Sequence, residues 1–284
     1  MTRAAVVTGA ARGIGAATVI KLAGAGWRVL AVDRCADDPR LPYPLGTEAD
    51  LAAVVCRAQE AAGAEGRAGA EGRAGAENRA GAENRVRSQV GDAASAEDMG
   101  RAVASAEREF GGLDAMIAVA GVIAGGVPLW EMPVEQQDAV LEVNLKSVLV
   151  ASRVGIPALL RRPQPRMGRF VAVASAAATR GLPMLAAYCA AKAGVTGLVR
   201  ALAAELRGTG ITANAVSPGS TATPILDESA RLYGLESAEA FSSQQPIARL
   251  IRPEEVATTI AWLADSSTGA VTGASLPVDG GLSL

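Results

Sequence analysis

Tyr188 and Lys192 stand four positions apart in a stretch rich in helix-forming residues. Residues at this spacing project from the same face of a helix, so the phenol and the ammonium can act on one reacting atom. A phenol is ordinarily protonated near neutral pH, and a nearby positive charge stabilises its phenolate. The pair therefore predicts proton transfer, with Tyr188 as general base in one direction and general acid in the other.

Ser175 lies 13 residues before Tyr188, directly after an apolar strand candidate, and its hydroxyl could hold the substrate oxygen. Taken alone, a tyrosine and a lysine on one helix more often reflect packing and a surface charge. The coincidence with Ser175 and with a glycine-rich motif near the N-terminus favours catalysis instead.

The glycine-rich motif covers residues 8–15 and connects an apolar strand candidate, residues 4–7, to a helical pattern. In such a turn Gly9 permits the tight bend, Gly13 lets the backbone approach a pyrophosphate, and Gly15 lets helix and strand pack closely. The N-terminus of the following helix offers free N–H groups to phosphate oxygens. This setting predicts a dinucleotide-binding site.

Asp33 ends the second strand candidate, 18 residues after Gly15. A carboxylate there accepts both ribose hydroxyls of an adenosine and repels a 2′-phosphate, which favours NAD over NADP. Arg12 and Arg34 could soften that repulsion, so an NADP-dependent enzyme stays open as an alternative.

The composition excludes several other classes of protein. A net charge of −2 without a dense Lys/Arg cluster argues against nucleic acid as a partner. The chain has no histidine, and Cys35, Cys56 and Cys189 show no CxxC spacing, so we expect neither a metal site nor a disulfide framework. No secretion signal is visible, and the longest mostly apolar run, residues 115–127, is shorter than the ~20 residues of a membrane span. We therefore expect a cytoplasmic protein without membrane contact.

Short apolar runs alternate with longer helical patterns along the chain, which predicts βαβ units and one α/β domain over residues 1–284 with a doubly wound parallel sheet. Helices are expected over residues 95–110, opened by a capping box of Ser95 and Asp98, and over residues 134–160. Strands are expected at residues 4–7, 29–32, 115–119, 169–174, 212–216 and 275–278.

Residues 62–85 interrupt this plan with four tandem hexapeptides, Ala-Gly-Ala-Glu-Gly-Arg twice and Ala-Gly-Ala-Glu-Asn-Arg twice. Recurring glycines disfavour a helix, and no large apolar side chain is available for burial. We expect a solvated, flexible insertion between the second and third strands rather than a binding element.

Together these motifs resemble the short-chain dehydrogenase/reductase family over the whole chain outside the repeat. Residues 8–15 match the family's TGxxxGxG, and Ser175 with the Tyr188–Lys192 pair matches its serine and YxxxK. Asn144 matches the catalytic asparagine, whose helix holds a water that passes protons to solvent. The resemblance implies a Rossmann-type fold and hydride transfer between an alcohol or carbonyl substrate and NAD(H). The sequence Val-Asp-Gly-Gly at 278–281 also matches, in a region that packs between subunits in relatives, which implies a homotetramer.

The resemblance also extends the predicted cofactor site. Residues after Pro218 are expected to contact the nicotinamide carboxamide, and Asp92 the adenine edge. The predicted cofactor contacts are Gly9, Arg12, Gly13, Ile14, Gly15, Asp33, Arg34, Asp92, Ala93, Ala120, Gly121, Tyr188, Lys192, Pro218, Gly219, Thr221 and Thr223. One departure is visible: the family's Asn-Asn-Ala-Gly reads Ala-Val-Ala-Gly at residues 118–121, so two amide side chains are missing.

The long connection over residues 34–47 resembles the mycofactocin-coupled branch of the family. That resemblance implies an NAD that stays bound and is recycled in place by mycofactocin as an external redox carrier. With Leu41, Tyr43 and Leu45 between prolines, the connection is expected to fold over the adenosine half of the cofactor. A neutral insertion is the alternative interpretation.

The leading hypothesis is therefore an NAD-dependent oxidoreductase acting on a small-molecule alcohol or carbonyl, in which Asn144, Ser175, Tyr188 and Lys192 are catalytic. An apolar substrate is expected to contact Leu182, Met184, Ile225, Leu226, Tyr233 and Phe241. Two alternatives stay open: an NADPH-dependent carbonyl reductase, and a non-catalytic dinucleotide-binding sensor that has kept the fold.

Overall fold

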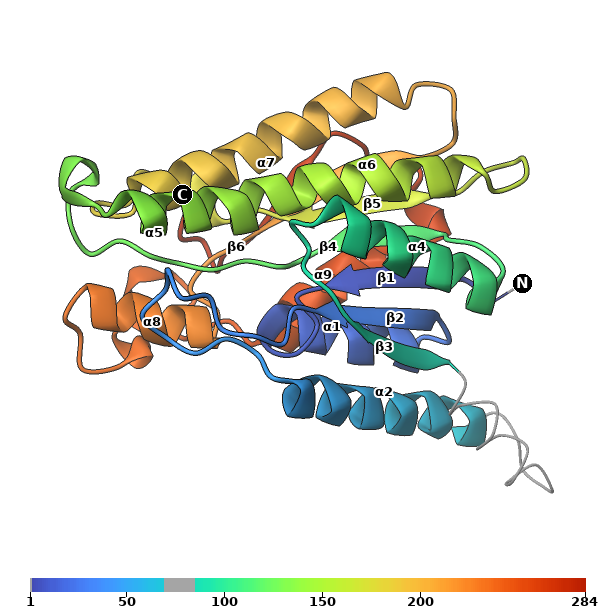
Figure 1. Cartoon of the computed structure of the whole chain (residues 1–284), viewed down its shortest axis with the longest axis horizontal. Helices are drawn as coiled ribbons and strands as arrows, with labels where there is room; N and C mark the ends of the chain where they lie inside the picture. The colour runs from blue at the N-terminus through green and yellow to red at the C-terminus, as the bar shows by residue number, and fades with distance from the viewer. Residues whose placement is uncertain (1, 69–84) are drawn as a thin grey trace.

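The computed structural model describes residues 2–68 and 85–284. Seven parallel strands form one sheet in the order β3-β2-β1-β4-β5-β6-β7, so the chain order reverses between β1 and β4 (Figure 1). This is the predicted single-domain, Rossmann-type doubly wound fold. The strands are β1 (Ala4–Thr8), β2 (Arg28–Asp33), β3 (Val86–Val90), β4 (Ala115–Ala118), β5 (Arg169–Val173), β6 (Thr212–Pro218) and β7 (Ser275–Val278).

Helices cover both faces of the sheet, with α4, α6 and α7 on one face and α1, α2 and α9 on the other (Figure 1). The helices are α1 (Gly13–Gly24), α2 (Glu48–Ala68), α4 (Ala96–Phe110), α5 (Val134–Leu141), α6 (Ser147–Leu160), α7 (Ala186–Glu205), α8 (Pro224–Leu232) and α9 (Pro253–Ala264). Shorter helical turns are η1 (Leu129–Glu131), η2 (Glu142–Lys146), η3 (Ala176–Ala178), η4 (Ala238–Gln244) and η5 (Ser266–Thr268).

The central strands are buried on both faces, which explains why they read as short apolar runs in the sequence. The edge strand β3 differs because only Val86 is fully buried among its residues. Its polar sequence, Val-Arg-Ser-Gln-Val, contains no apolar run, so the sequence did not reveal its position.

The predicted helix over residues 134–160 is present, but a single π-helical turn, η2, divides it into α5 and α6. Asn144 lies in this turn and is fully buried. Such turns interrupt helices where a side chain must be placed off the regular register, often at functional sites. In the described part of the chain, Val134–Leu160 is also the one helix long and apolar enough to span a membrane, yet half of its most apolar window is buried inside the domain.

The start of the hexapeptide repeat is not a loop, since α2 continues through it to Ala68. Ala62 is 2% exposed and packs with the α1–α2 core, so this alanine does find a surface to bury against. Residues 62–68 of the predicted insertion are therefore helical. Residues 69–84 of the repeat lie outside the described residues.

Two helix starts carry side-chain caps, and the one at Ser95 was predicted. Thr47 and Asp50 cap α2 reciprocally, with the Thr47 N–H donating to Asp50 at 2.9 Å and the Asp50 N–H donating to Thr47 at 3.1 Å. At α4 the Ser95 hydroxyl accepts from the Asp98 N–H at 3.2 Å, as predicted. The Asp98 carboxylate, however, accepts from the Asp92 N–H at 2.9 Å, so it fixes the loop after β3 instead of closing the capping box.

Candidate active site

A cavity of about 570 Å³ opens at the carboxyl ends of the strands, across the point where the strand order reverses. Doubly wound sheets bind their ligands at this point, because the loops after neighbouring strands diverge there. Every predicted cofactor contact lines this cavity, and so do Ser175, Tyr188 and Lys192. Of the predicted catalytic residues, Asn144 is the one that does not reach the cavity.

The glycine turn after β1 is held against the loop after β4. Gly9 has φ +67°, and a Cβ there would lie 2.7 Å from the Cα of Ala120. A Cβ at Gly15 would overlap the carbonyl oxygen of Gly9. The Thr8 hydroxyl accepts from the N–H groups of Val119 and Ala120 at 3.1 and 3.3 Å, which joins the two loops. The glycines are therefore needed for close approach as well as for the turn.

Asp33 presents its carboxylate to the cavity from the end of β2. Its two oxygens accept from the Ala11 N–H at 2.9 Å and from the Cys35 N–H at 3.1 Å, so the carboxylate is fixed in place. Each oxygen keeps lone-pair capacity for a further donor. Arg34 lines the cavity as predicted, but its guanidinium donates to Asp38 and to the Asp37 carbonyl, both at 3.0 Å.

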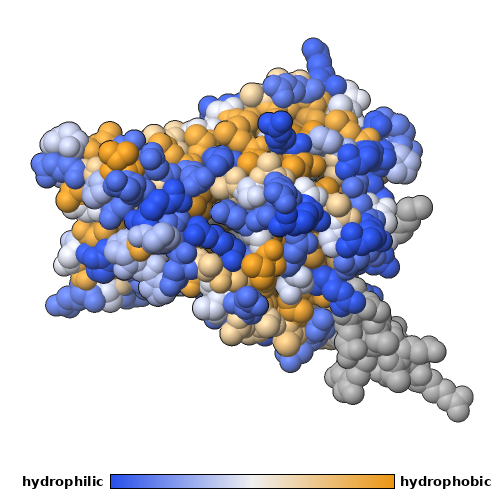
Figure 2. Space-filling model, in the orientation of Figure 1, coloured by the Kyte–Doolittle hydropathy of each residue, from blue (hydrophilic) through white to orange (hydrophobic). Residues whose placement is uncertain are grey.

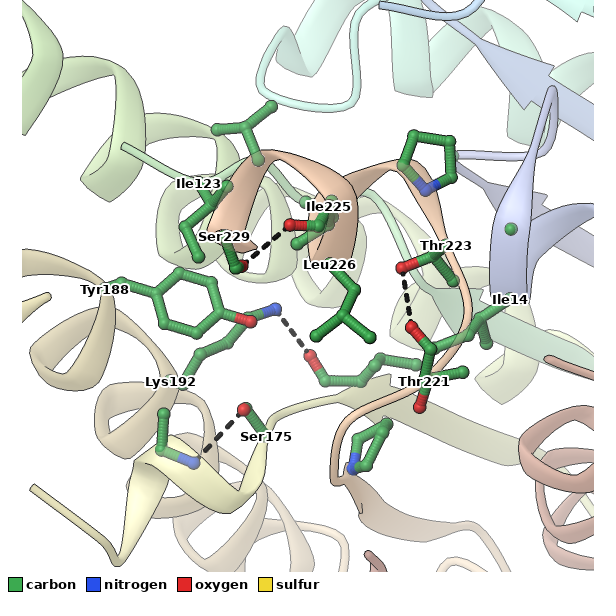
Figure 3. A pocket seen from close by; sticks show the side chains of 18 of the residues that line it. Ile14, Ile123, Ser175, Tyr188, Lys192, Thr221, Thr223, Ile225, Leu226 and Ser229 are labelled. Carbon is green, nitrogen blue, oxygen red and sulfur yellow. Dashed lines mark hydrogen bonds between the residues drawn. The ribbon is translucent and has the colours of Figure 1, made fainter. Parts of the chain in front are cut away.

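Three predicted catalytic side chains meet on one wall of the cavity. Tyr188 projects from the first turn of α7, and Lys192 lies one turn later with its Nζ 5.7 Å from the Tyr188 ring centroid. Ser175 precedes η3, where its Oγ accepts from the Ala177 N–H at 3.1 Å. Figure 3 shows these three side chains together, with Ile225, Leu226 and Ser229 of α8 across the pocket.

The ionisation of the pair differs from the sequence expectation. Burial raises the pKa of Tyr188 to about 12, and a hydrogen bond with Ser175 only partly opposes this rise. The predicted lowering of the tyrosine pKa is therefore not found in the protein alone, because loss of solvation outweighs the hydrogen bond with Ser175. Burial also lowers the pKa of Lys192 to about 8, and its Nζ donates to the Val173 carbonyl at 2.9 Å.

Asn144 acts on the backbone behind the cavity. Its Nδ2 donates to the carbonyls of Val122 and Val140, both at 2.8 Å, and its Oδ1 accepts from the Val122 N–H at 3.3 Å. The π turn thus places this amide between α5 and the segment after β4. A Cβ at Gly121 would lie 3.0 Å from Asn144 Oδ1 and 3.5 Å from Lys192 Nζ, so the glycine lets all three groups converge.

Apolar side chains from α8 and its neighbours form the other end of the cavity. Five of the six residues expected around an apolar substrate line it: Leu182, Ile225, Leu226, Tyr233 and Phe241. Met184 does not, because its backbone turns away with φ +60° while its carbonyl accepts from the Gly126 N–H at 3.1 Å. Tyr233 and Phe241 pack edge to face at 6.1 Å, and the Tyr233 hydroxyl donates to the Pro183 carbonyl at 2.8 Å.

Several lining residues had no sequence signal of their own. Leu282 reaches the cavity from the C-terminal segment, where Arg180 donates to its carbonyl at 2.5 Å. Val122 and Ile123 follow Gly121 directly and could have been included by extending that motif. Gly46 comes from the connection after β2, named here the strap (residues 34–47). Leu45 of the strap, which was expected near the cofactor, also lines the cavity.

The three cysteines do not act together in the active-site cavity. All three are free thiols, and burial raises the pKa of Cys35 to about 11, which keeps it protonated. Within residues 2–68 and 85–284, no three His, Cys, Asp or Glu side chains gather where they could hold a metal ion.

Known proteins are similar to this chain in sequence and in fold. Residues 3–62 match the family model described as short chain dehydrogenase, and residues 47–283 match the one described as enoyl-(acyl carrier protein) reductase. The cis-4-hydroxycyclohexanecarboxylate dehydrogenase of Sinomonas cyclohexanicum is 37% identical over 282 residues, covering 98% of this chain and 96% of that protein.

Two solved structures superpose on nearly the whole chain. Carveol dehydrogenase from Mycobacterium avium in complex with NAD gives a TM-score of 0.84 at 28% identity, covering 99% of this chain and 97% of that one. A variant of actinorhodin polyketide ketoreductase with NADPH gives 0.82 at 30% identity and the same coverage. The glycine turn, the Ser-Tyr-Lys wall and these matches lead to one conclusion: the chain belongs to the short-chain dehydrogenase/reductase family of oxidoreductases.

Proposed function

We propose that this oxidoreductase uses NAD to oxidise an apolar alcohol reversibly. The observation that carries the proposal is one cavity that holds Asp33 at one end and Ser175, Tyr188 and Lys192 at the other. The first residue suits an adenosine ribose and the other three suit a reacting alcohol. An intact set of this kind argues against a non-catalytic sensor.

Preference for NAD over NADP is supported by the charges around Asp33. Its fixed carboxylate would repel a 2′-phosphate, and the guanidinium of Arg34 is already engaged by Asp38 and the Asp37 carbonyl. The glycine turn fits a pyrophosphate, since Gly9 and Gly15 leave no Cβ in the way. Relatives include a structure titled as a complex with NAD and another titled with NADPH, so the family alone does not decide the cofactor.

The chain's own residues would handle the proton. Ser175 would orient the substrate hydroxyl, and Tyr188 would take its proton as the carbon is oxidised. Lys192, whose pKa lies near 8, would exchange its own proton with solvent in mildly alkaline solution and pass a proton to the Tyr188 phenolate. Asn144 would hold the backbone beside Lys192 and support the relay to solvent. When bound, the nicotinamide supplies the acceptor for the hydride.

An apolar substrate is supported by Leu182, Ile225, Leu226 and Phe241 at the end of the cavity beyond Tyr188. Several relatives carry names of cyclic substrates, among them carveol dehydrogenase, levodione reductase and cis-4-hydroxycyclohexanecarboxylate dehydrogenase. We infer that the chain acts on a secondary alcohol borne on an apolar ring.

We further propose that NAD is retained during turnover and is reoxidised in place by an external carrier such as mycofactocin. Support comes from the strap, which lines the cavity with Leu45 and Gly46 and packs Leu41 beyond it. A segment anchored at both ends of the cofactor cavity would slow escape of the dinucleotide.

A homotetramer is also proposed. Figure 2 shows hydrophobic residues over α6 and α7, and Leu149 of α6 is 46% exposed. An apolar face on paired helices is a common basis for self-association. Light scattering after size exclusion would give a mass four times that of the 28.6 kDa chain, and a monomer mass would refute the proposal.

The experiment that tests the function combines exchange and turnover. Purified protein should carry NAD, and it should oxidise cyclic apolar alcohols such as cyclohexanol and carveol repeatedly only when an artificial electron acceptor is present. Dilution into labelled NAD should release the bound nucleotide slowly. Exchange within seconds with free NAD-dependent turnover would refute retention but keep the dehydrogenase; no reaction with any alcohol or ketone of the panel would refute the activity itself.

A further inference from the structure

From the sequence we expected the strap to lie over the adenosine half of the cofactor. In the structure it extends further, to the catalytic end of the cavity. Gly46 lies beside Asp33, with its Cβ position 3.5 Å from Asp33 Oδ1. Further back along the strap, Leu41 is 8% exposed and packs with apolar residues of the segment after β4 and of α5. The strap therefore touches both the ribose end and the backbone that supports catalysis.

Tyr43 makes the polar contact between the strap and that backbone. Its hydroxyl accepts from the Ile123 N–H at 2.9 Å, across 80 residues of sequence, while its ring packs with the same apolar cluster. Most of the side chain is buried, and burial raises the pKa of Tyr43 to about 12, so its hydroxyl stays neutral at working pH. The contact is thus a neutral hydrogen bond inside an apolar setting.

Ile123 is the third of three consecutive residues that side chains hold in place. Gly121 lies against Asn144 and Lys192, and Val122 is bound through both its N–H and its carbonyl by Asn144. Ile123 has Tyr43. Because positions 118 and 119 are alanine and valine, the segment supplies no polar side chain of its own at its start.

A second contact joins the strap to the other side of Asn144. Arg40 pairs with Glu142 at 2.9 Å, and Glu142 begins the π turn that carries Asn144. Arg40 also pairs with Asp38 at 2.7 Å, and the Asp38 side chain is 1% exposed. The two backbone segments that Asn144 joins are therefore each held by one strap residue.

We propose that Tyr43 is a positioning residue, which holds the Gly121–Ile123 backbone beside Asn144 and Lys192 only while the strap is closed. Closure of the strap over the cofactor then also aligns the groups that transfer the proton. This inference rests on the proposed function, because strap closure refers to a cofactor bound in the cavity. The contact between Tyr43 and Ile123 can nevertheless be measured without any substrate.

The test removes one hydroxyl. In Tyr43→Phe the ring still packs, while the Ile123 N–H loses its acceptor inside the protein. Amide exchange at Ile123, resolved by NMR on the protein with NAD added, should become about tenfold faster or more, with the α4 amides unchanged. With the best alcohol of the panel, kcat should fall about tenfold while KM stays within about threefold. Thr258→Val serves as the control, because it deletes an exposed hydroxyl of α9 that donates to the Glu254 carbonyl.

A second variant tests the coupling itself. Arg40→Gln leaves the Tyr43 hydroxyl in place but loosens the strap at Glu142, so exchange at Ile123 should still rise and NAD should be released faster. Unchanged exchange at Ile123 in Tyr43→Phe would overturn the positioning role. Faster exchange in Tyr43→Phe but not in Arg40→Gln would overturn the coupling to the strap. If no alcohol reacts, the proposed function fails, yet both exchange measurements still decide this inference.

Discussion

Gly121 and Asn144 lie so close together that a Cβ at position 121 would be 3.0 Å from Asn144 Oδ1, which is tighter than most real Cβ contacts. The same Cβ would lie 3.5 Å from Lys192 Nζ. The backbone of Gly121 has no positive φ, so its conformation is one that any residue can adopt. The glycine is thus favoured by the close approach of Asn144 and Lys192 and not by its own backbone conformation.

Gly121→Ala should therefore damage catalysis more than folding. The added methyl must displace the Asn144 amide, which would lengthen its bonds to Val122 and disturb Lys192. We expect kcat to fall at least about tenfold, with a loss of stability of about 1–2 kcal/mol. Gly100→Ala in α4 is the matched control, since nothing lies within 4 Å of its Cβ position, and it should keep full activity. Equal kinetics for the two variants would contradict the argument.

Tyr188→Phe should abolish turnover while leaving NAD affinity within about threefold. The change removes the titratable oxygen and its hydrogen bond with Ser175 but keeps the ring in place. Steady-state rates and nucleotide binding by fluorescence titration measure the two effects separately. Activity above about one per cent of wild type would assign the proton transfer to another group.

Asp33→Ala should weaken NAD binding and shift preference toward NADP, because a repulsive charge and two ribose acceptors disappear together. The variant also frees the N–H groups of Ala11 and Cys35, so part of the loss comes from a looser turn. Asp33→Asn separates these causes, since it removes the charge and keeps an acceptor oxygen. We expect Asn to recover part of the NAD affinity but to keep the relaxed discrimination; an unchanged NAD/NADP ratio in both variants would place the discriminator elsewhere.

The sequence predicted those parts of the fold that local pattern determines. Central strands are buried on both faces and so appear as apolar runs, whereas β3, an edge strand with three consecutive polar residues, does not. The glycine turn was predictable because each of its glycines stands where a side chain would be sterically unfavourable in a turn of this kind. The repeat begins inside a helix that its composition did not indicate, since α2 runs to Ala68 and Ala62 packs on the α1–α2 core despite the low helix propensity of glycine.

The site was predictable up to its tertiary contacts. The four-residue spacing placed Tyr188 and Lys192 together, but nothing local indicated that burial would raise the pKa of the tyrosine and lower that of the lysine. The bond between Tyr43 and Ile123 joins residues 80 positions apart. No spacing rule reaches that far, so this contact became visible only in the structure.

Lys192 should make the stability of the protein depend on pH in a definite window. Its pKa is about 8 in the folded protein, against an ordinary value of 10.5, so between these pH values the unfolded chain binds a proton that the folded protein does not. Stability must then rise with pH across this window, because burial disfavours the charged form and that cost disappears as the lysine loses its proton.

Lys192→Met should remove this rise. Urea denaturation at pH 7 and pH 9.5 would give the free energy of unfolding of both proteins, and the difference between them should move in favour of wild type by about 1–2 kcal/mol over that range. Tyr43 and Tyr188, with pKa values raised to about 12, are present in both proteins, so the titration of the unfolded tyrosines cancels in this difference. Lys21→Met in α1 is the control, since that lysine is exposed. A constant difference between wild type and Lys192→Met from pH 7 to pH 9.5 would mean that Lys192 keeps its ordinary pKa, and the proton relay through it would lose its physical basis.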